Sequence, residues 1–140
     1  MMPLTYLHSL VELTFVRVVT DECAVLRGEM AGHGRQVTLQ VYSTWRVEAE
    51  QQCILGSFDA LGAELPKLVE VNKCLRSLIG LRIESVASAE VRIPDLKLEV
   101  QGHRISSFST SYRGLAWKFS EGLMICSLTF SNGNPLVTYA

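Results

Sequence analysis

The stretch Arg35-Gln-Val-Thr-Leu-Gln-Val-Tyr-Ser-Thr-Trp-Arg-Val47 indicates the fold more clearly than any other part of the chain. Val37, Leu39 and Val41 alternate with polar residues, which is typical of a strand with one buried face. The alternation runs on through Trp45. We therefore expect one extended strand over residues 35–47, with its apolar face packed on a core.

A looser copy of this region returns in the second half of the chain. Three short motifs recur in the same order, pairing Leu7-His-Ser-Leu10 with Leu75-Arg-Ser-Leu78, Gly32-His33 with Gly102-His103, and Trp45-Arg46-Val47 with Trp117-Lys118-Phe119. Their spacing drifts, so chance similarity between two β-meanders stays an alternative to a true duplication. If the duplication is real, neither half closes a core alone and the two halves pack together.

Turn residues and alternating apolar positions divide the rest of the chain. We expect further strands over residues 14–20, 23–30, 53–55, 81–86, 95–100, 105–109, 115–119, 124–130 and 136–139. Residues 4–13 fit either a short helical turn or an irregular lead-in. One helix is expected from Pro66 to Ser77, because apolar residues recur there every three to four positions and proline fits a first helical turn. The residues expected to face the sheet are Leu68, Val69, Leu75 and Leu78.

These elements predict a single α+β domain over residues 1–140. The expected fold consists of antiparallel β-meanders in two related halves, with one helix packed on the sheet. The halves cover about residues 4–57 and 75–139 and are joined by a helical linker over residues 58–74. A chain of 140 residues that is 48% hydrophobic is long enough for one core. Whether the strands form one sheet or two stays open.

The charge balance argues against two classes of partner. Thirteen Lys and Arg residues against fourteen Asp and Glu residues give a net charge of -1. No field of one sign therefore attracts nucleic acid or an anionic membrane. No apolar run reaches the roughly 20 residues of a membrane-spanning helix, and residues 1–8 lack the pattern of a signal peptide. We expect a cytoplasmic protein that binds neither nucleic acid nor membrane.

Catalytic and metal-binding motifs are absent from the sequence. It contains no Gly-x-Ser-x-Gly, no glycine-rich phosphate loop and no His-Glu-x-x-His. His33 and His103 are expected to be solvated turn residues. The cysteines are scattered singly, so we expect buried, reduced thiols and no zinc site; they lie at Cys23, Cys53, Cys74 and Cys126. We therefore predict no catalytic residue, no cofactor and no metal.

Aromatic and cationic residues are the best candidates for a binding surface, because Trp, Tyr and Arg dominate interaction hot spots. Trp45 and Trp117 could serve as anchors, but alternation along a strand favours core positions for both. The loop over residues 106–112 mixes hydroxyl and aromatic side chains, as recognition loops do, or it is a hydrophilic connection. The residues predicted to bind a partner are Tyr42, Arg46, Tyr112 and Arg113.

Several stretches resemble a loose class of small bacterial proteins, the immunity proteins of polymorphic and contact-dependent toxin systems. The residues that carry the resemblance are Leu78-Ile-Gly-Leu-Arg-Ile-Glu-Ser-Val86, Asp95-Leu-Lys-Leu-Glu-Val100 with Gly102, and Trp45-Arg46 with Ile54-Leu-Gly-Ser57 and Asp59. The resemblance covers most of the chain, and its motifs mainly specify turns and a sheet. It implies a cytoplasmic protein whose partner is a toxin domain that it binds and blocks, and it implies no catalytic residue.

Two other functions stay open. The first is a small-molecule carrier or enzyme whose sheets enclose a pocket. The second is a structural homo-oligomer, because the final hairpin ends in Leu136-Val-Thr-Tyr-Ala140 and could leave an edge strand that pairs with a second copy to form a homodimer.

Overall fold

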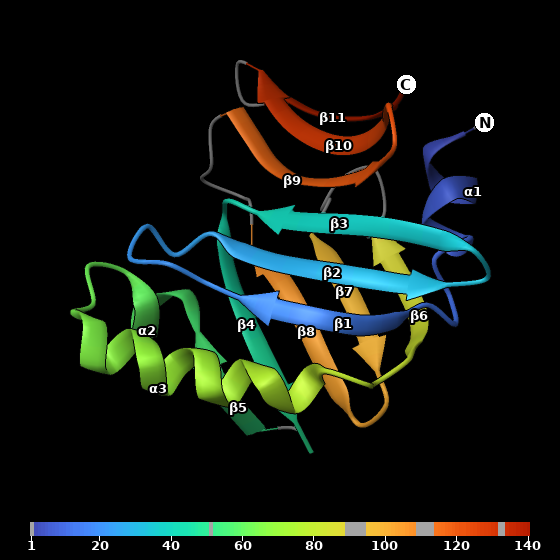
Figure 1. Cartoon of the computed structure of the whole chain (residues 1–140). Helices are drawn as coiled ribbons and strands as arrows, with labels where there is room; N and C mark the ends of the chain where they lie inside the picture. Colours follow the sequence, from blue (N-terminus) through green and yellow to red (C-terminus); the bar gives the residue numbers. More distant parts are fainter. Residues whose placement is uncertain (1, 51, 89–94, 109–113, 132–133) are drawn as a thin grey trace.

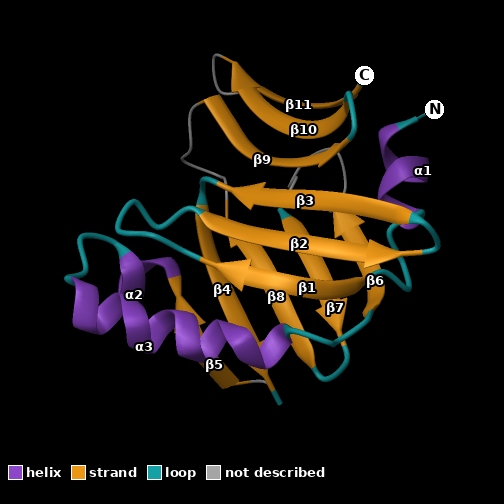
Figure 2. Cartoon of the chain, in the orientation of Figure 1, coloured by secondary structure: helices purple, strands orange, loops and turns teal. Residues whose placement is uncertain are grey.

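The computed structural model describes residues 2–50, 52–88, 95–108, 114–131 and 134–140, and within them two β-sheets with short helices (Figures 1 and 2). The helices are α1 (Pro3–His8), α2 (Ser57–Ala60), α3 (Leu65–Leu75) and the 3-10 turn η1 (Arg76–Leu78). The strands are β1 (Thr14–Val19), β2 (Leu26–Gly32), β3 (Arg35–Val41), β4 (Thr44–Ala49), β5 (Gln52–Gly56), β6 (Ile83–Ser88), β7 (Leu96–Val100), β8 (His103–Phe108), β9 (Gly114–Glu121), β10 (Met124–Ser131) and β11 (Asn134–Tyr139). None of these helices is long and apolar enough to cross a bilayer.

The strands form sheet A in the order β1-β2-β3-β9-β10-β11 and sheet B in the order β5-β4-β8-β7-β6, and the pairing is antiparallel. The chain makes the same passage twice. A three-strand meander, β1 to β3, lies in sheet A before β4 enters sheet B. A second meander, β6 to β8, lies in sheet B before β9 enters sheet A. The α+β class is confirmed, and the strands of the described residues form two sheets.

The stretch over residues 35–47 is two strands in different sheets, so the prediction of one continuous strand was wrong. The chain leaves sheet A at Tyr42 and Ser43, whose backbone N–H groups both donate to the carbonyl oxygen of Ala116, at 2.8 and 3.2 Å. Ser43 and Trp45 nevertheless continue the buried alternation of β3. The alternation of buried and exposed side chains therefore continues through residues 42 and 43, so this pattern does not reveal the change of sheet.

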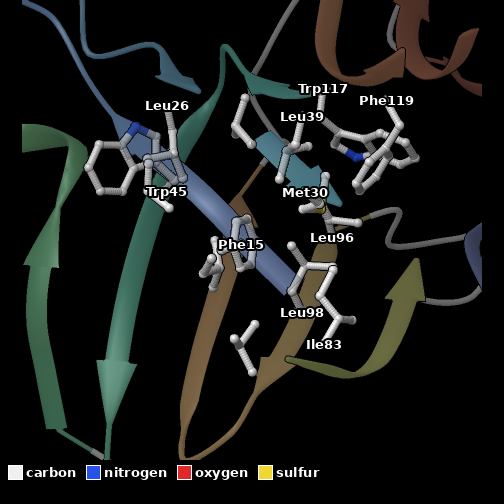
Figure 3. Packing of buried hydrophobic residues seen from close by; sticks show 14 of the residues in the cluster. Phe15, Leu26, Met30, Leu39, Trp45, Ile83, Leu96, Leu98, Trp117 and Phe119 are labelled. Atoms are coloured by element: carbon white, nitrogen blue, oxygen red, sulfur yellow. The ribbon is translucent and has the colours of Figure 1, made fainter. Parts of the chain in front are cut away.

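The strands of the two sheets cross steeply (Figure 1), and the core lies between the sheets (Figure 3). Trp45 and Trp117 are fully buried, as their strand positions predicted. The Trp45 indole Nε1 donates to the carbonyl oxygen of Ala24 at 2.8 Å, so its polar atom is satisfied inside the core. On β7, Leu96 and its alternate neighbours Leu98 and Val100 point inward as expected.

The predicted helix is present but packs differently. α3 begins at Leu65 and lies beside β1 (Figure 1). Val69 is 57% exposed, which contradicts its expected sheet-facing position, and Val71 is buried instead. The side chain of Asn72 bonds both backbone groups of Thr20, accepting at 2.8 Å and donating at 3.2 Å. The single expected helix is thus accompanied by α1 and α2, which the sequence pattern left undecided or missed.

Candidate functional site

Two hollows that share Phe58 as a lining residue lie where α2 meets β4. The larger, of about 400 Å³, is lined by Thr44, Trp45, Arg46, Gly56, Phe58, Asp59 and Phe108. The smaller, of about 110 Å³, is lined by Cys23, Ala24, Tyr42, Ser43, Thr44, Ser57, Phe58 and Leu61. Because Thr44 and Phe58 line both, the hollows form one surface, which we call the Phe58 surface and define by these residues.

The backbone of α2 is fixed at its start by two side-chain hydrogen bonds. The Gly56 N–H donates to Asp59 Oδ2 at 2.8 Å, as an acidic residue in a first helical turn commonly arranges. The Trp45 N–H donates to Ser57 Oγ at 3.3 Å and ties the helix to β4. With Ser57 and Ala60 buried, Phe58 is directed outward and is 79% exposed. The exposed ring therefore stands on a held backbone.

The end of α2 is also anchored. Gly62 has a φ of +67°, a conformation that glycine adopts without strain, and its N–H donates to the Glu22 carbonyl oxygen at 2.8 Å. This bond joins the α2–α3 connection to the β1–β2 turn. Leu61, one residue earlier, is 59% exposed and lines the smaller hollow.

Arg46 forms the cationic wall of the larger hollow. Its guanidinium carbon lies 4.5 Å from the centroid of the Phe108 ring, within the range of a cation–π contact. Its Nε lies 3.4 Å from Glu48 Oε1. The Arg46 side chain is 48% exposed. The two contacts hold the guanidinium group in place while it stays accessible to a partner.

Exposed apolar side chains continue from α2 onto α3. Leu65 is 73% exposed and Val69, one helical turn further on, is 57% exposed. Large apolar groups gathered at a surface are typical of interaction sites, whereas single ones are ordinary. The α2–α3 unit therefore presents four of them, at Phe58, Leu61, Leu65 and Val69.

The structure places two of the four predicted binding residues on this surface. Tyr42 lines the smaller hollow, is half-buried, and its O–H donates to Gln40 Oε1 at 3.1 Å. Arg46 lines the larger hollow. Tyr112 and Arg113 lie outside the described residues. Phe58 was missed. A signal was present in Gly56-Ser57-Phe58-Asp59, because the acidic residue lies three positions after the last residue of a strand, where it can hold the start of a helix.

A third hollow, of about 430 Å³, lies at the other end of β4 and β8. It is lined by Glu48, Glu50, Glu99, Gly102, His103 and Arg104. Arg104 donates from Nε to Glu99, so these two charges balance each other. Among the described residues no group of three or more His, Cys, Asp or Glu side chains is placed to hold a metal ion.

The histidines and cysteines are dispersed. His33 is exposed in the β2–β3 turn, 3.8 Å from Glu12, as predicted. His103 is half-buried and is the first residue of β8, so its predicted turn position was wrong by one residue. Burial raises the pKa of the Cys126 thiol to about 11. Cys23 and Cys74 are exposed free thiols, so the expectation that all thiols are buried was wrong for these two. The Cys53 side chain lies outside the described residues.

Comparison of the chain with protein-family models, with curated proteins and with solved structures found no significant match. The resemblance to immunity proteins therefore rests on the sequence motifs alone.

Proposed function

We propose that this chain is a protein-binding domain whose partner docks on the Phe58 surface. The observation that carries the proposal is the exposed Phe58 ring on a backbone held by Asp59 and Ser57. Burying one large apolar side chain is worth roughly 1.5–3 kcal/mol, and a backbone that is already fixed needs little ordering on binding. An aromatic side chain on a fixed backbone that lines two hollows is thus well suited to be a hot spot.

The surface also specifies what the partner presents. An aliphatic or aromatic side chain fits the hollow between Phe58 and Phe108, and a carboxylate from the partner can pair with the accessible guanidinium group of Arg46. A complex of ordinary size buries about 800 Å² on each partner. Docking of that extent reaches from the two hollows onto the apolar residues of α3.

We propose that the partner is a bacterial toxin domain and that the chain acts as its immunity protein. The sequence resemblance supports this identification, as does a binding surface that needs no catalytic group. We further propose that the protein acts in the cytoplasm, where Cys23, Cys74 and Cys126 stay reduced.

The two halves are, we propose, copies of one ancestral unit. Each supplies a three-strand meander to one sheet and then sends the next strand into the other sheet. The paired motifs follow the same order, since Gly32 and Gly102 lie at the turn before the third strand of each meander. Trp45 and Trp117 then lie in the strands that change sheet, β4 and β9.

The test is affinity capture from the native cells with three purified baits, followed by mass spectrometry. The baits are the wild-type chain, Phe58→Ala and the matched control Leu123→Ala, whose side chain is 98% exposed in the β9–β10 turn. We expect one stoichiometric partner that Phe58→Ala loses and Leu123→Ala retains. Equal capture by all three baits would rule out the Phe58 surface.

The immunity assignment has its own test. The gene of the captured partner is expressed alone and together with this chain. We expect the partner to arrest growth when it is expressed alone. The wild-type chain should relieve this arrest, and Phe58→Ala should relieve it less. A partner that is harmless when expressed alone would reject the immunity role while leaving the binding surface intact.

A further inference from the structure

β11 is the outermost strand of sheet A, and its outer backbone edge can be assigned residue by residue. The N–H and carbonyl groups of Ala140 and Ile125 bond each other, at 3.0 and 2.8 Å. Bonded and non-bonded pairs alternate along an antiparallel ladder, so Thr138 also bonds β10. Val137 and Tyr139, which lie between these positions, direct their N–H and carbonyl groups away from β10.

Each of the other outer strands in the described part of the chain has an irregular register, and β1 and β6 each also have one residue whose outer backbone groups are already hydrogen-bonded. The backbone carbonyl oxygen of Phe15 in β1 accepts from the Gly80 N–H at 2.8 Å, and the Phe15 N–H donates to the Leu81 carbonyl oxygen at 3.0 Å. The backbone carbonyl oxygen of Ile83 in β6 accepts from the Glu12 N–H, and the Ile83 N–H donates to the Leu13 carbonyl oxygen, each at 2.8 Å. A register shift interrupts the pairing of β4 with the short strand β5. β11 has an unbroken register with β10 and carries no charged side chain that would repel another strand.

We propose that β11 pairs with β11 of a second copy of this chain, antiparallel and with Thr138 opposite Thr138 of the partner subunit. Val137 then exchanges both backbone hydrogen bonds with Tyr139 of the partner subunit, and the twofold axis repeats the exchange. Sheet A continues across the dimer. This inference goes beyond the proposed function, because the Phe58 surface is built by other strands and helices.

Pro135 selects this register over the neighbouring one. Centring the axis on Val137 would place Pro135 opposite Tyr139 of the partner subunit, and proline has no N–H to donate. One Tyr139 carbonyl oxygen in each subunit would then lack its bond. Centring on Thr138 leaves Pro135 outside the exchanged bonds and satisfies every outward group of Val137 and Tyr139.

The side chains also suit this register. Val137 and Tyr139 are half-buried on the core-facing side of the hairpin, so Val137 meets Tyr139 of the partner subunit, a favourable aliphatic–aromatic cross-strand pair. The Tyr139 ring is already held by Tyr6 of α1, with centroids 4.8 Å apart. At the twofold axis Thr138 lies opposite Thr138 of the partner subunit, so no like charges face each other there.

Disulfide trapping tests both the dimer and its register. In a Cys23→Ser, Cys53→Ser, Cys74→Ser background, Thr138→Cys is compared with Val137→Cys under mild oxidation. The proposed register brings the two Cα atoms at position 138 to about 4.5 Å, within disulfide range. We expect Thr138→Cys to form covalent dimers at least roughly tenfold faster than Val137→Cys. Faster trapping through position 137 would overturn the register.

Val137→Pro supplies the second measurement. The N–H of Val137 points away from β10, so proline at this position removes no hydrogen bond between β10 and β11 and is tolerated on this edge. Two of the exchanged bonds are lost, which we expect to weaken dimerisation roughly tenfold or more in sedimentation equilibrium. Circular dichroism should stay near wild type, and so should the thermal midpoint at a concentration low enough for both proteins to be monomers. A wild-type chain that sediments as a monomer at every concentration, up to the millimolar range, would overturn the proposal.

Discussion

Arg35 and Glu121 form a two-point ion pair across the junction of β3 and β9. Arg35 Nε donates to Glu121 Oε2 at 2.8 Å and a terminal guanidinium nitrogen donates to Oε1 at 2.7 Å. The Tyr6 hydroxyl group donates a hydrogen bond to Glu121 Oε1 at 3.1 Å, and Arg35 also donates to the Ser9 carbonyl oxygen at 2.7 Å. The cluster therefore joins α1 to the two strands at which the halves of the chain meet in sheet A.

The first prediction is a pH-dependent loss of stability at Glu121. The hydrogen bonds from Arg35, together with that from Tyr6, hold the pKa of Glu121 below its ordinary value. The unfolded state thus takes up a proton at higher pH than the folded state, and the stabilisation is present above about pH 4.5 and is lost as pH falls through the lowered pKa. We expect Glu121→Gln to lower the free energy of unfolding at pH 7 by about 1–2 kcal/mol.

Urea unfolding of wild type and Glu121→Gln at several pH values between 7 and 3 measures this effect. The difference between the two proteins should shrink as the solution becomes more acidic, because the wild-type carboxyl group becomes neutral. A difference that stays constant across the range would show that the ion pair contributes nothing through its charge.

The second prediction concerns thiol reactivity. Burial raises the pKa of Cys126 to about 11, whereas Cys23 and Cys74 are exposed. Only the thiolate reacts with alkylating agents, so iodoacetamide at pH 8 should label positions 23 and 74 and leave position 126 unmodified until urea is added. Peptide mapping by mass spectrometry reads each site separately. Labelling of Cys126 in the folded protein at the rate of Cys74 would contradict its burial.

The third prediction is steric. A Cβ atom added at Gly28 would lie 2.8 Å from Cε1 of Phe15, whose ring is 1% exposed and cannot move freely. Gly28→Ala should therefore destabilise the protein by about 1–3 kcal/mol through overpacking. Gly56→Ala is the matched control, because its nearest atom, the Trp45 carbonyl oxygen, lies at an ordinary 3.4 Å. Denaturant midpoints that shift equally in both variants would argue against the close approach of β2 to Phe15.

Much of the strand content follows from sequence, because a half-buried strand imposes period two on its side chains. Leu96, Leu98 and Val100 illustrate this, since each was expected inward and each is buried. The change of sheet at Tyr42 could not be predicted in the same way. It depends on hydrogen bonds to Ala116, which lies far along the chain, and it leaves the alternation through Trp45 undisturbed.

The candidate site was less predictable than the fold. Tyr42 and Arg46 were selected as aromatic and cationic residues on one strand, and both line the Phe58 surface. Phe58 itself was missed, because the exposure of an apolar residue in a four-residue helix depends on which neighbours the helix buries. Val69 was misplaced for a related reason, since α3 turns Val71 and Leu75 inward beside β1.

Docking on the Phe58 surface is tested most directly by the affinity of the purified partner for the wild-type chain, Phe58→Ala and Leu123→Ala, determined by calorimetric titration at one salt concentration. We expect Phe58→Ala to weaken binding by about 2 kcal/mol, roughly 30-fold, and Leu123→Ala to stay within about twofold of wild type. Wild-type affinity for Phe58→Ala would show that the partner does not dock on the Phe58 surface.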